Sequence, residues 1–342
     1  MKHIAILEPA GAGDLVLAVP AIRALGRHYG GAALQLYVAS ANTTLAEVLF
    51  PDASLRPVDF PHLARDVTAN AKGSADVGGL AKELDQFDVV FCLRDDAILQ
   101  SLLAPLWTET EMVDGSRDVH ATAAHRSAVC RQIPAYSRTA LFSGTQVMWP
   151  RMIGHVGLSI AAAVPAGRWP TIRWTELALQ LTAAGQFVSL IGSAGDEAEL
   201  QFIAGVLGDR PHRVLQVEQQ DYASFIHAVG EIDLVVGCDG PTAHLCALKK
   251  TVVSLFGPTA WRRCAPFGWS NLVISRELVC QPCLQPAAQT DGDLVHGCLT
   301  RECLASITVS QVLAAIHSGG VDFSAVRGVW VQKGTSHAYA GG

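Results

Sequence analysis

Short apolar runs alternate with helical patterns along the first part of the chain. Residues 3–9 form an apolar run that predicts a β-strand, a glycine-rich turn follows at 10–14, and apolar positions from 16 to 27 recur with the period of a helix. Strand, glycine turn and helix in this order open a doubly wound α/β unit. Further strands are predicted at 34–39, 88–93 and 111–114, and helices at 44–49 and 79–84.

The same alternation returns after an irregular stretch at 133–152 that contains Pro134, Gly144 and Pro150. The strands predicted there lie at 155–160, 187–192, 213–217, 234–237 and 251–256, and the helices at 174–184, 196–207, 222–229, from 241 and at 309–317. Unbroken runs of Val, Ile and Leu are typical of parallel strands covered on both faces. The pattern therefore predicts two facing Rossmann-like domains with a cleft between them, at 1–150 and 151–332, and a disordered tail at 333–342.

Composition narrows the classes of function. The 342 residues include 25 Lys and Arg against 31 Asp and Glu, a net charge of -6, which gives no general attraction for nucleic acid, so an anionic ligand must meet a local positive site. No apolar run reaches the roughly 20 residues of a membrane span, and the first run is too short for a signal peptide. The nine cysteines, an odd number, suit a reducing compartment. We therefore expect a cytoplasmic protein.

Asp14 is the first candidate for chemistry. It follows Gly11 and Gly13, in a turn that partly matches the dinucleotide fingerprint G-x-G-x-x-G, but Val16 replaces the last glycine. A carboxylate at the start of a helix would repel a pyrophosphate there. It could instead be a general base that takes a proton from an acceptor hydroxyl, or simply the N-cap of the helix.

A second candidate is the segment 237–244, which follows an apolar strand. Gly240 suits an N-cap and Pro241 the first helical position, so the amides of Thr242 and Ala243 could point at an anion such as a diphosphate. Asp239 could accept hydrogen bonds from sugar hydroxyls, and His244 could contact the phosphate or orient Asp239. A plain strand-to-helix turn explains the same residues.

A third candidate is Arg168, which precedes Trp169 and a predicted helix. In a chain poor in basic residues, its guanidinium is a natural partner for a leaving phosphate, although a solvated surface arginine is the simpler interpretation. Trp169 and Trp174 are expected to pack in the core. The turn at 254–259 could line the cleft beside the 239–244 segment.

Four cysteines lie close together in a segment at 280–303. Cys280, Cys283, Cys298 and Cys303 could hold a structural zinc or iron ion as thiolates, with His296 as a spare ligand, or could be free thiols in a packed loop. Residues that follow strands of the first domain are candidates to bind an anionic acceptor; they are Arg94, Arg117, His120 and Arg126.

Taken together, these segments resemble glycosyltransferase family 9, the heptosyltransferases that extend the inner core of lipopolysaccharide. The resemblance rests on the run from Gly13 to Ala21 with Leu25, on Trp169-Pro170, on Asp239 with His244, and on 256–259, in the family's order. It implies a GT-B fold and transfer of heptose from ADP-heptose, with inversion at the anomeric carbon, to a saccharide or glycolipid acceptor. It implies no cofactor for catalysis and allows peripheral contact with the inner membrane.

The resemblance also implies roles for individual residues. Asp14 falls on the catalytic aspartate, and Glu197 falls near an acidic residue that binds the donor ribose. Asp239, Gly240, Thr242, Ala243 and His244 fall on the donor-binding loop, and Arg168 is positioned to meet the departing ADP. The cysteine segment is similar to a four-cysteine iron site in family members that modify autotransporter proteins.

Two departures from the family pattern concern the donor site. Gly167 stands where the family usually has lysine, and Pro241 removes an amide donor from the loop. Three alternatives therefore stay open: a transferase with another nucleotide-sugar or a protein acceptor, a binding protein without turnover, and a dinucleotide-dependent oxidoreductase. Asp14 and Val16 disfavour the last.

Overall fold

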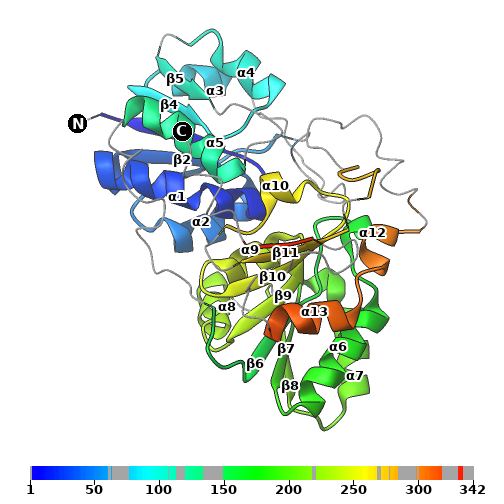
Figure 1. The fold of residues 1–342 in the computed structure, drawn as a ribbon. Coiled ribbons are helices and arrows are strands. Elements are labelled where there is room, and N and C mark those ends of the chain that lie inside the picture. The colour runs from blue at the N-terminus through cyan, green and yellow to red at the C-terminus, as the bar shows by residue number, and fades with distance from the viewer. Residues whose placement is uncertain are drawn as a thin grey trace. The chain divides into compact units, whose positions relative to one another are not determined.

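The chain divides into two compact units, Met1–Thr145 and Gln146–Gly342. A computed structural model (Figure 1) describes residues 2–60, 63, 77–106, 108–112, 120–133, 149–217, 221–267, 271–276, 278–283, 298, 300–317 and 330–333. Each unit is built around its own sheet, as the alternating pattern predicts.

A five-stranded parallel sheet forms the centre of the first unit. Its order is β3-β2-β1-β4-β5. The strands are β1 (Ile4–Glu8), β2 (Leu34–Val38), β3 (Ser54–Pro57), β4 (Val89–Cys92) and β5 (Glu109–Met112). The two central strands, β1 and β4, are buried along their whole length, which matches their unbroken apolar sequences.

Helices pack on this sheet. They are α1 (Ala12–Tyr29), α2 (Thr43–Leu49), α3 (Val77–Leu84), α4 (Ala97–Leu103) and α5 (Ala121–Gln132), with short 3₁₀ turns η1 (Gly31–Ala33) and η2 (Ser40–Asn42). Alternate residues of β1, Ala5 and Leu7, share a core cluster with Leu80 of α3 and Leu99 of α4. The long helix α1 lies against β1 and β2 and packs on α5.

The second unit has a seven-stranded sheet. Its order is β12-β11-β10-β9-β6-β7-β8, parallel except for the antiparallel edge strand β12. The strands are β6 (His155–Ser159), β7 (Phe187–Gly192), β8 (His212–Gln216), β9 (Leu234–Cys238), β10 (Thr251–Phe256), β11 (Leu272–Ser275) and β12 (Trp330–Lys333). Lys333 therefore ends a strand, and the rest of the predicted tail, 334–342, lies outside the described residues.

The helices of the second unit follow its strands. They are α6 (Thr171–Ala183), α7 (Glu197–Leu207), α8 (Tyr222–Val229), α9 (Pro241–Ala247), α10 (Trp261–Cys264), α12 (Glu302–Ala305) and α13 (Val309–His317), with η5 (Pro165–Gly167) and η6 (Ala194–Asp196). As expected, Trp169 and Trp174 are core residues: they stack edge to face at 4.8 Å, and the Trp169 indole N–H donates to the Ile307 carbonyl at 3.0 Å.

None of the helices that the structure describes is long and apolar enough to cross a bilayer.

Both sheets contain a point where the strand order reverses. In the first unit the chain leaves β1 for β2 and β3 on one side and returns to β4 and β5 on the other. In the second unit it leaves β6 for β7 and β8 and returns to β9 and β10. Open α/β sheets bind ligands at the carboxyl ends of the strands beside such a reversal. These two points are therefore where a site is expected in each unit.

Candidate functional site

Asp14 lies at the reversal point of the first sheet. Helix α1 begins directly after β1 with Gly11 as its N-cap, and Asp14 occupies the first helical turn. The interpretation of Asp14 as the N-cap is therefore wrong, because the helix has already started at Ala12. The partial positive charge at a helix N-terminus favours an ionised carboxylate in this position.

Arg94 follows β4, the strand next to β1, and pairs with Asp14. Its Nη1 atom lies 3.2 Å from Oδ1 of Asp14, and both side chains are partly exposed, 18% and 25% respectively. The adjacency of the two strands brings together residues that are far apart in the sequence. The arginine proposed for the acceptor thus contacts the candidate base directly.

The other acceptor candidates have different environments. His120 is buried and caps α5, since its Nδ1 accepts a hydrogen bond from the Thr122 amide at 3.3 Å. Arg126 is half-buried on the same helix, and Arg117 lies outside the described residues. The structure therefore brings Arg94 to Asp14, whereas it gives His120 a contact within its own helix.

Sequence reasoning missed two ionisable groups near Asp14. Glu8 ends β1 with 1% of its surface exposed, and burial raises its pKa to about 8. His125 is buried on α5, its Nδ1 lies 3.4 Å from the Leu17 carbonyl, and burial lowers its pKa to about 4. A signal for Glu8 was present, because a carboxylate closes an otherwise apolar strand. Nothing comparable marks His125.

The segment that follows β9 lies at the reversal point of the second sheet. The Ala163 amide, after β6, donates to the Asp239 carbonyl at 2.9 Å. A Cβ atom on Gly240 would lie 3.1 Å from the Ala162 Cα, 3.2 Å from the Ala161 carbonyl oxygen and 3.2 Å from the Ala163 nitrogen. Glycine is favoured at this position because the two loops approach so closely. Gly240 is the N-cap of α9, and Pro241 is within its first turn, as predicted.

Side chains of this segment are buried around Asp239. The His244 Nε2 lies 3.6 Å from Oδ1 of Asp239, and the Cys264 sulfur lies 4.0 Å from Oδ2. The Nδ1 of His244 is buried and has no hydrogen-bond partner among the residues that the structure describes. Thr242 and Ala243 are also buried, in the first turn of α9. His244 thus lies beside Asp239, and its two predicted roles, orienting Asp239 or contacting the phosphate, stay predictions.

Arg168 contacts carboxylates. Its guanidinium pairs with Asp196, whose side chain is completely buried, and with Glu199 at 3.1 Å. Both carboxylates belong to the turn and helix that follow β7. The positive charge predicted to meet a phosphate is thus already compensated within the β7–α7 connection.

Glu197 begins α7 and is exposed. Its carboxylate accepts hydrogen bonds from the side-chain amides of Gln201, at 3.0 Å, and Gln216. Gln216 is the last residue of β8, so Glu197 lies at the carboxyl edge of the sheet. This edge also carries the segment after β9.

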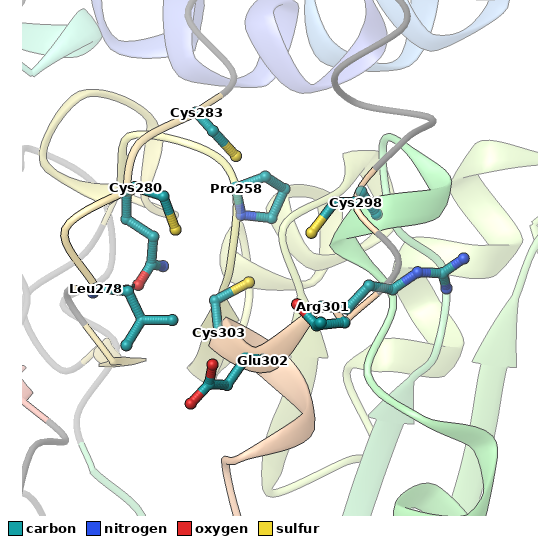
Figure 2. Close-up of a pocket in the computed structure, with 11 residues that line it drawn as sticks. Pro258, Leu278, Cys280, Cys283, Cys298, Arg301, Glu302 and Cys303 are labelled. Atoms are coloured by element: carbon teal, nitrogen blue, oxygen red, sulfur yellow. Dashed lines mark hydrogen bonds between the residues drawn. The ribbon is translucent and has the colours of Figure 1, made fainter.

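The four clustered cysteines surround one small cavity of ≈ 80 Å³. Figure 2 shows their sulfur atoms directed toward a common space beside Pro258. All four are free thiols, and burial, with smaller contributions from the three facing thiols, raises the pKa of Cys303 to about 11. Within the described residues, however, no three His, Cys, Asp or Glu side chains are close enough together to hold a metal. His296 lies outside those residues.

This cysteine segment packs against the turn that follows β10. The side-chain amide of Gln281 donates to the Gly257 carbonyl at 2.5 Å. A Cβ on Gly257 would lie 2.8 Å from two carbon atoms of Leu304 and 3.2 Å from the Cys303 sulfur. The predicted metal segment and the 256–259 turn are therefore in direct contact.

Comparisons with known proteins bear on this arrangement. The model of glycosyltransferase family 9 (heptosyltransferase) matches residues 122–292, half of the chain. A comparison with curated protein sequences finds no match.

Several solved structures resemble the chain over most of its length. The E. coli ADP-heptose lipopolysaccharide heptosyltransferase II is 18% identical with a TM-score of 0.63, over 93% of this chain and 98% of its own. A family 9 glycosyltransferase from Veillonella parvula is 16% identical with a TM-score of 0.66, over 93% and 97%. The dodecameric iron-containing glycosyltransferase TibC of enterotoxigenic E. coli is 12% identical with a TM-score of 0.52, over 93% and 76%. These likenesses confirm the predicted GT-B fold.

Proposed function

The chain belongs to glycosyltransferase family 9, and on that premise we propose that it transfers heptose from ADP-heptose to a hydroxyl group of a lipopolysaccharide core acceptor, with inversion at the anomeric carbon. The observation that carries this proposal is the environment of Asp14. Its carboxylate lies at a strand-order reversal, in the first turn of α1, 3.2 Å from Arg94. The resemblance of the E. coli ADP-heptose enzyme to this chain supports the choice of donor.

In the proposed reaction Asp14 is the general base. It accepts the proton of the acceptor hydroxyl as the hydroxyl oxygen attacks the anomeric carbon of the heptose. The bond between that carbon and the β-phosphate oxygen breaks, and ADP leaves with the bonding electrons. Attack on the face opposite the leaving group inverts the configuration.

The donor site is proposed at the carboxyl edge of the second sheet. Gly240 and Pro241 start α9 so that the amides of Thr242 and Ala243 can face the diphosphate, where backbone dipoles stabilise the charge that develops on the leaving group. Asp239, held beside His244, is proposed to bind sugar or ribose hydroxyls. Glu197, at the same edge, is proposed for the ribose.

The transfer can be tested with purified protein, ADP-heptose and a heptose-deficient core acceptor, by measuring ADP release and product mass. We expect Asp14→Asn to lower kcat by about 10²–10⁴-fold, the usual contribution of a general base. Asp52→Asn, which changes an exposed turn before β3, is the control and should keep the wild-type rate. Stabilisation of both variants by ADP would show that the donor site is intact.

Three results would contradict the proposal. Full activity of Asp14→Asn would show that Asp14 is not the general base. Release of UDP or GDP from other donors, but not of ADP from ADP-heptose, would show that the donor is a different nucleotide-sugar. Thermal stabilisation by ADP-heptose without any ADP release would identify a binding protein.

The cysteine cluster favours a second class of acceptor, a protein. Four free thiols facing one cavity are consistent with the likeness to an iron-containing glycosyltransferase. Including an autotransporter passenger domain among the acceptors tests this alternative directly. Heptose on the protein, with none on the saccharide, would replace the lipopolysaccharide assignment. We place either reaction in the cytoplasm, with the lipid-linked acceptor reached by peripheral contact with the inner membrane.

We also propose that Cys280, Cys283, Cys298 and Cys303 bind one structural zinc or iron ion, which would stabilise this segment and takes no part in catalysis. Thiolates are preferred ligands for both metals, and the four sulfur atoms already face a common space. Bringing them into contact with one ion requires the cavity to contract. Elemental analysis of protein produced with both metals should give one ion per chain, lost in Cys283→Ser and kept in the control Cys130→Ser. Metal-free wild-type protein would refute the site.

A further inference from the structure

A second carboxylate lies behind the proposed base. Glu8 ends β1 and is almost completely buried, and within the described part of the chain its Oε1 has no hydrogen-bond partner. This Oε1 lies 3.9 Å from Nη1 of Arg94, the same nitrogen that lies 3.2 Å from Oδ1 of Asp14. One end of a guanidinium therefore faces two carboxylates.

One positive charge does not compensate two negative ones when one of them, on Glu8, is almost completely buried. Burial is the main cause that raises the pKa of Glu8 to about 8; Arg94 opposes it and Asp14 adds to it. At neutral pH Glu8 therefore keeps its proton, and Asp14 is the ionised carboxylate that lies within 3.2 Å of Arg94. This arrangement satisfies the charge of Arg94 with the more exposed carboxylate.

We propose that Glu8 is a positioning residue for the transfer reaction, which sets the proton affinity of Asp14 through the arginine that both carboxylates share. The inference rests on the proposed role of Asp14 as the base. While Glu8 is neutral, Arg94 holds Asp14 tightly and lowers its affinity for a proton. Once Glu8 is ionised, Arg94 is shared and a second negative charge lies nearby, so Asp14 takes up the proton of the acceptor more readily.

Two neighbouring ionisable groups, Cys92 and His125, have pKa values outside this range. Cys92, on β4, faces Glu8, and burial raises its pKa to about 12. His125, on α5, faces Asp14, and its pKa is lowered to about 4. Asp96, after β4, acts on Arg94 as a further negative charge. Of Glu8, Cys92 and His125, Glu8 is the one whose pKa lies between 7 and 9.

The test compares the pH dependence of wild type, Glu8→Gln and Glu47→Gln, which alters an exposed carboxylate on α2. Glutamine mimics the protonated form of Glu8 and should fold normally. We expect kcat of the wild type and of Glu47→Gln to rise about three- to tenfold between pH 7 and 9, because proton affinity drives transfer to a general base. The Glu8→Gln variant should stay at the lower rate throughout.

A second measurement needs no substrate. In protein with ¹³C-labelled carboxyl groups, the Glu8 carbon should titrate near pH 8, and the Asp14 carbon should shift in the same step. That step in Asp14 should vanish in Glu8→Gln. A Glu8 that titrates near its ordinary value of 4.5, or an unchanged Asp14 titration in Glu8→Gln, would overturn the inference. If the titrations are coupled but no heptose is transferred, the proposed function fails and the coupling stands.

Discussion

The Arg168→Gln variant tests whether the Arg168 guanidinium binds the donor phosphate or stabilises the fold. The structure joins it to Asp196 and to Glu199. The Asp196 carboxylate also accepts hydrogen bonds from the Ser193 amide, at 2.8 Å, and from the Ser193 hydroxyl. Arg168→Gln would leave this buried carboxylate without a positive partner.

The cost can be worked from the burial of the two partners. Breaking a fully buried ion pair costs about 3–5 kcal/mol, because one charge stays behind uncompensated. Here the Arg168 side chain is 31% exposed, so water screens the pair, and Ser193 continues to bind Asp196. We expect a loss of about 1–3 kcal/mol. In a unit of this size, Gln146–Gly342, that lowers Tm by about 2–12 °C.

Calorimetry of the purified variant measures this change. The matched control is Arg173→Gln on α6, because Arg173 pairs with Glu176 at 3.2 Å while both side chains are more than a third exposed. It should cost less than about 0.5 kcal/mol. The donor KM is measured on the same samples. If Arg168→Gln had a Tm within 1 °C of the wild type and a kcat/KM reduced by about 100-fold or more, the structural role would be refuted. Such a result would instead support binding of the donor phosphate by Arg168.

Two further predictions concern stability in each unit. Gly257→Ala should lose about 1–3 kcal/mol in urea unfolding, because its Cβ would lie 2.8 Å from Leu304. Gly205→Ala, at an exposed position of α7 where no described neighbour lies within 4 Å of the added Cβ, should gain about 0.5–1 kcal/mol. Equal effects would contradict the packing of the cysteine segment on the turn after β10. His125 has a pKa of about 4 in the folded protein, below its value of 6.5 in the unfolded chain. The stability that the neutral histidine contributes is therefore present above pH 6.5 and is lost at about 1.4 kcal/mol per pH unit as the pH falls toward 4. His125→Gln should remove that loss, and an equally steep acid decline in the variant would show that His125 is not buried in its neutral form.

Much of the fold could be predicted because buried parallel strands have an unmistakable pattern. The strands at 187–192 and 251–256 are found with the predicted bounds. The strand β3 was missed because it is mostly exposed at a sheet edge and ends in proline, so it lacks an apolar run. Helix α5 was missed because most of its apolar residues are alanines, and polar and charged residues, His125 among them, interrupt them. The four-residue strands β11 and β12 were also missed.

Within the candidate site, too, some features could be predicted from the sequence and others could not. Local geometry could be predicted where it depends on backbone chemistry: Gly240 and Pro241 start α9 because glycine and proline favour those positions in any protein. The partners of charged side chains could not, because they depend on strand order. Arg94 reaches Asp14 only because β4 inserts beside β1, and Arg168 meets Asp196 only because the loops after β6 and β7 are neighbours.

Strand order also explains why the missed carboxylate is informative. A carboxylate at the end of a buried strand must either ionise beside a cation or keep its proton. The cation nearest to Glu8 is Arg94, which already pairs with Asp14. The position of β4 beside β1 therefore determines which of the two carboxylates ionises first. An apolar residue at position 8 would leave Arg94 and Asp14 as a simple pair. With glutamate there, we infer that the proton affinity of the proposed base depends on a group that no substrate needs to touch.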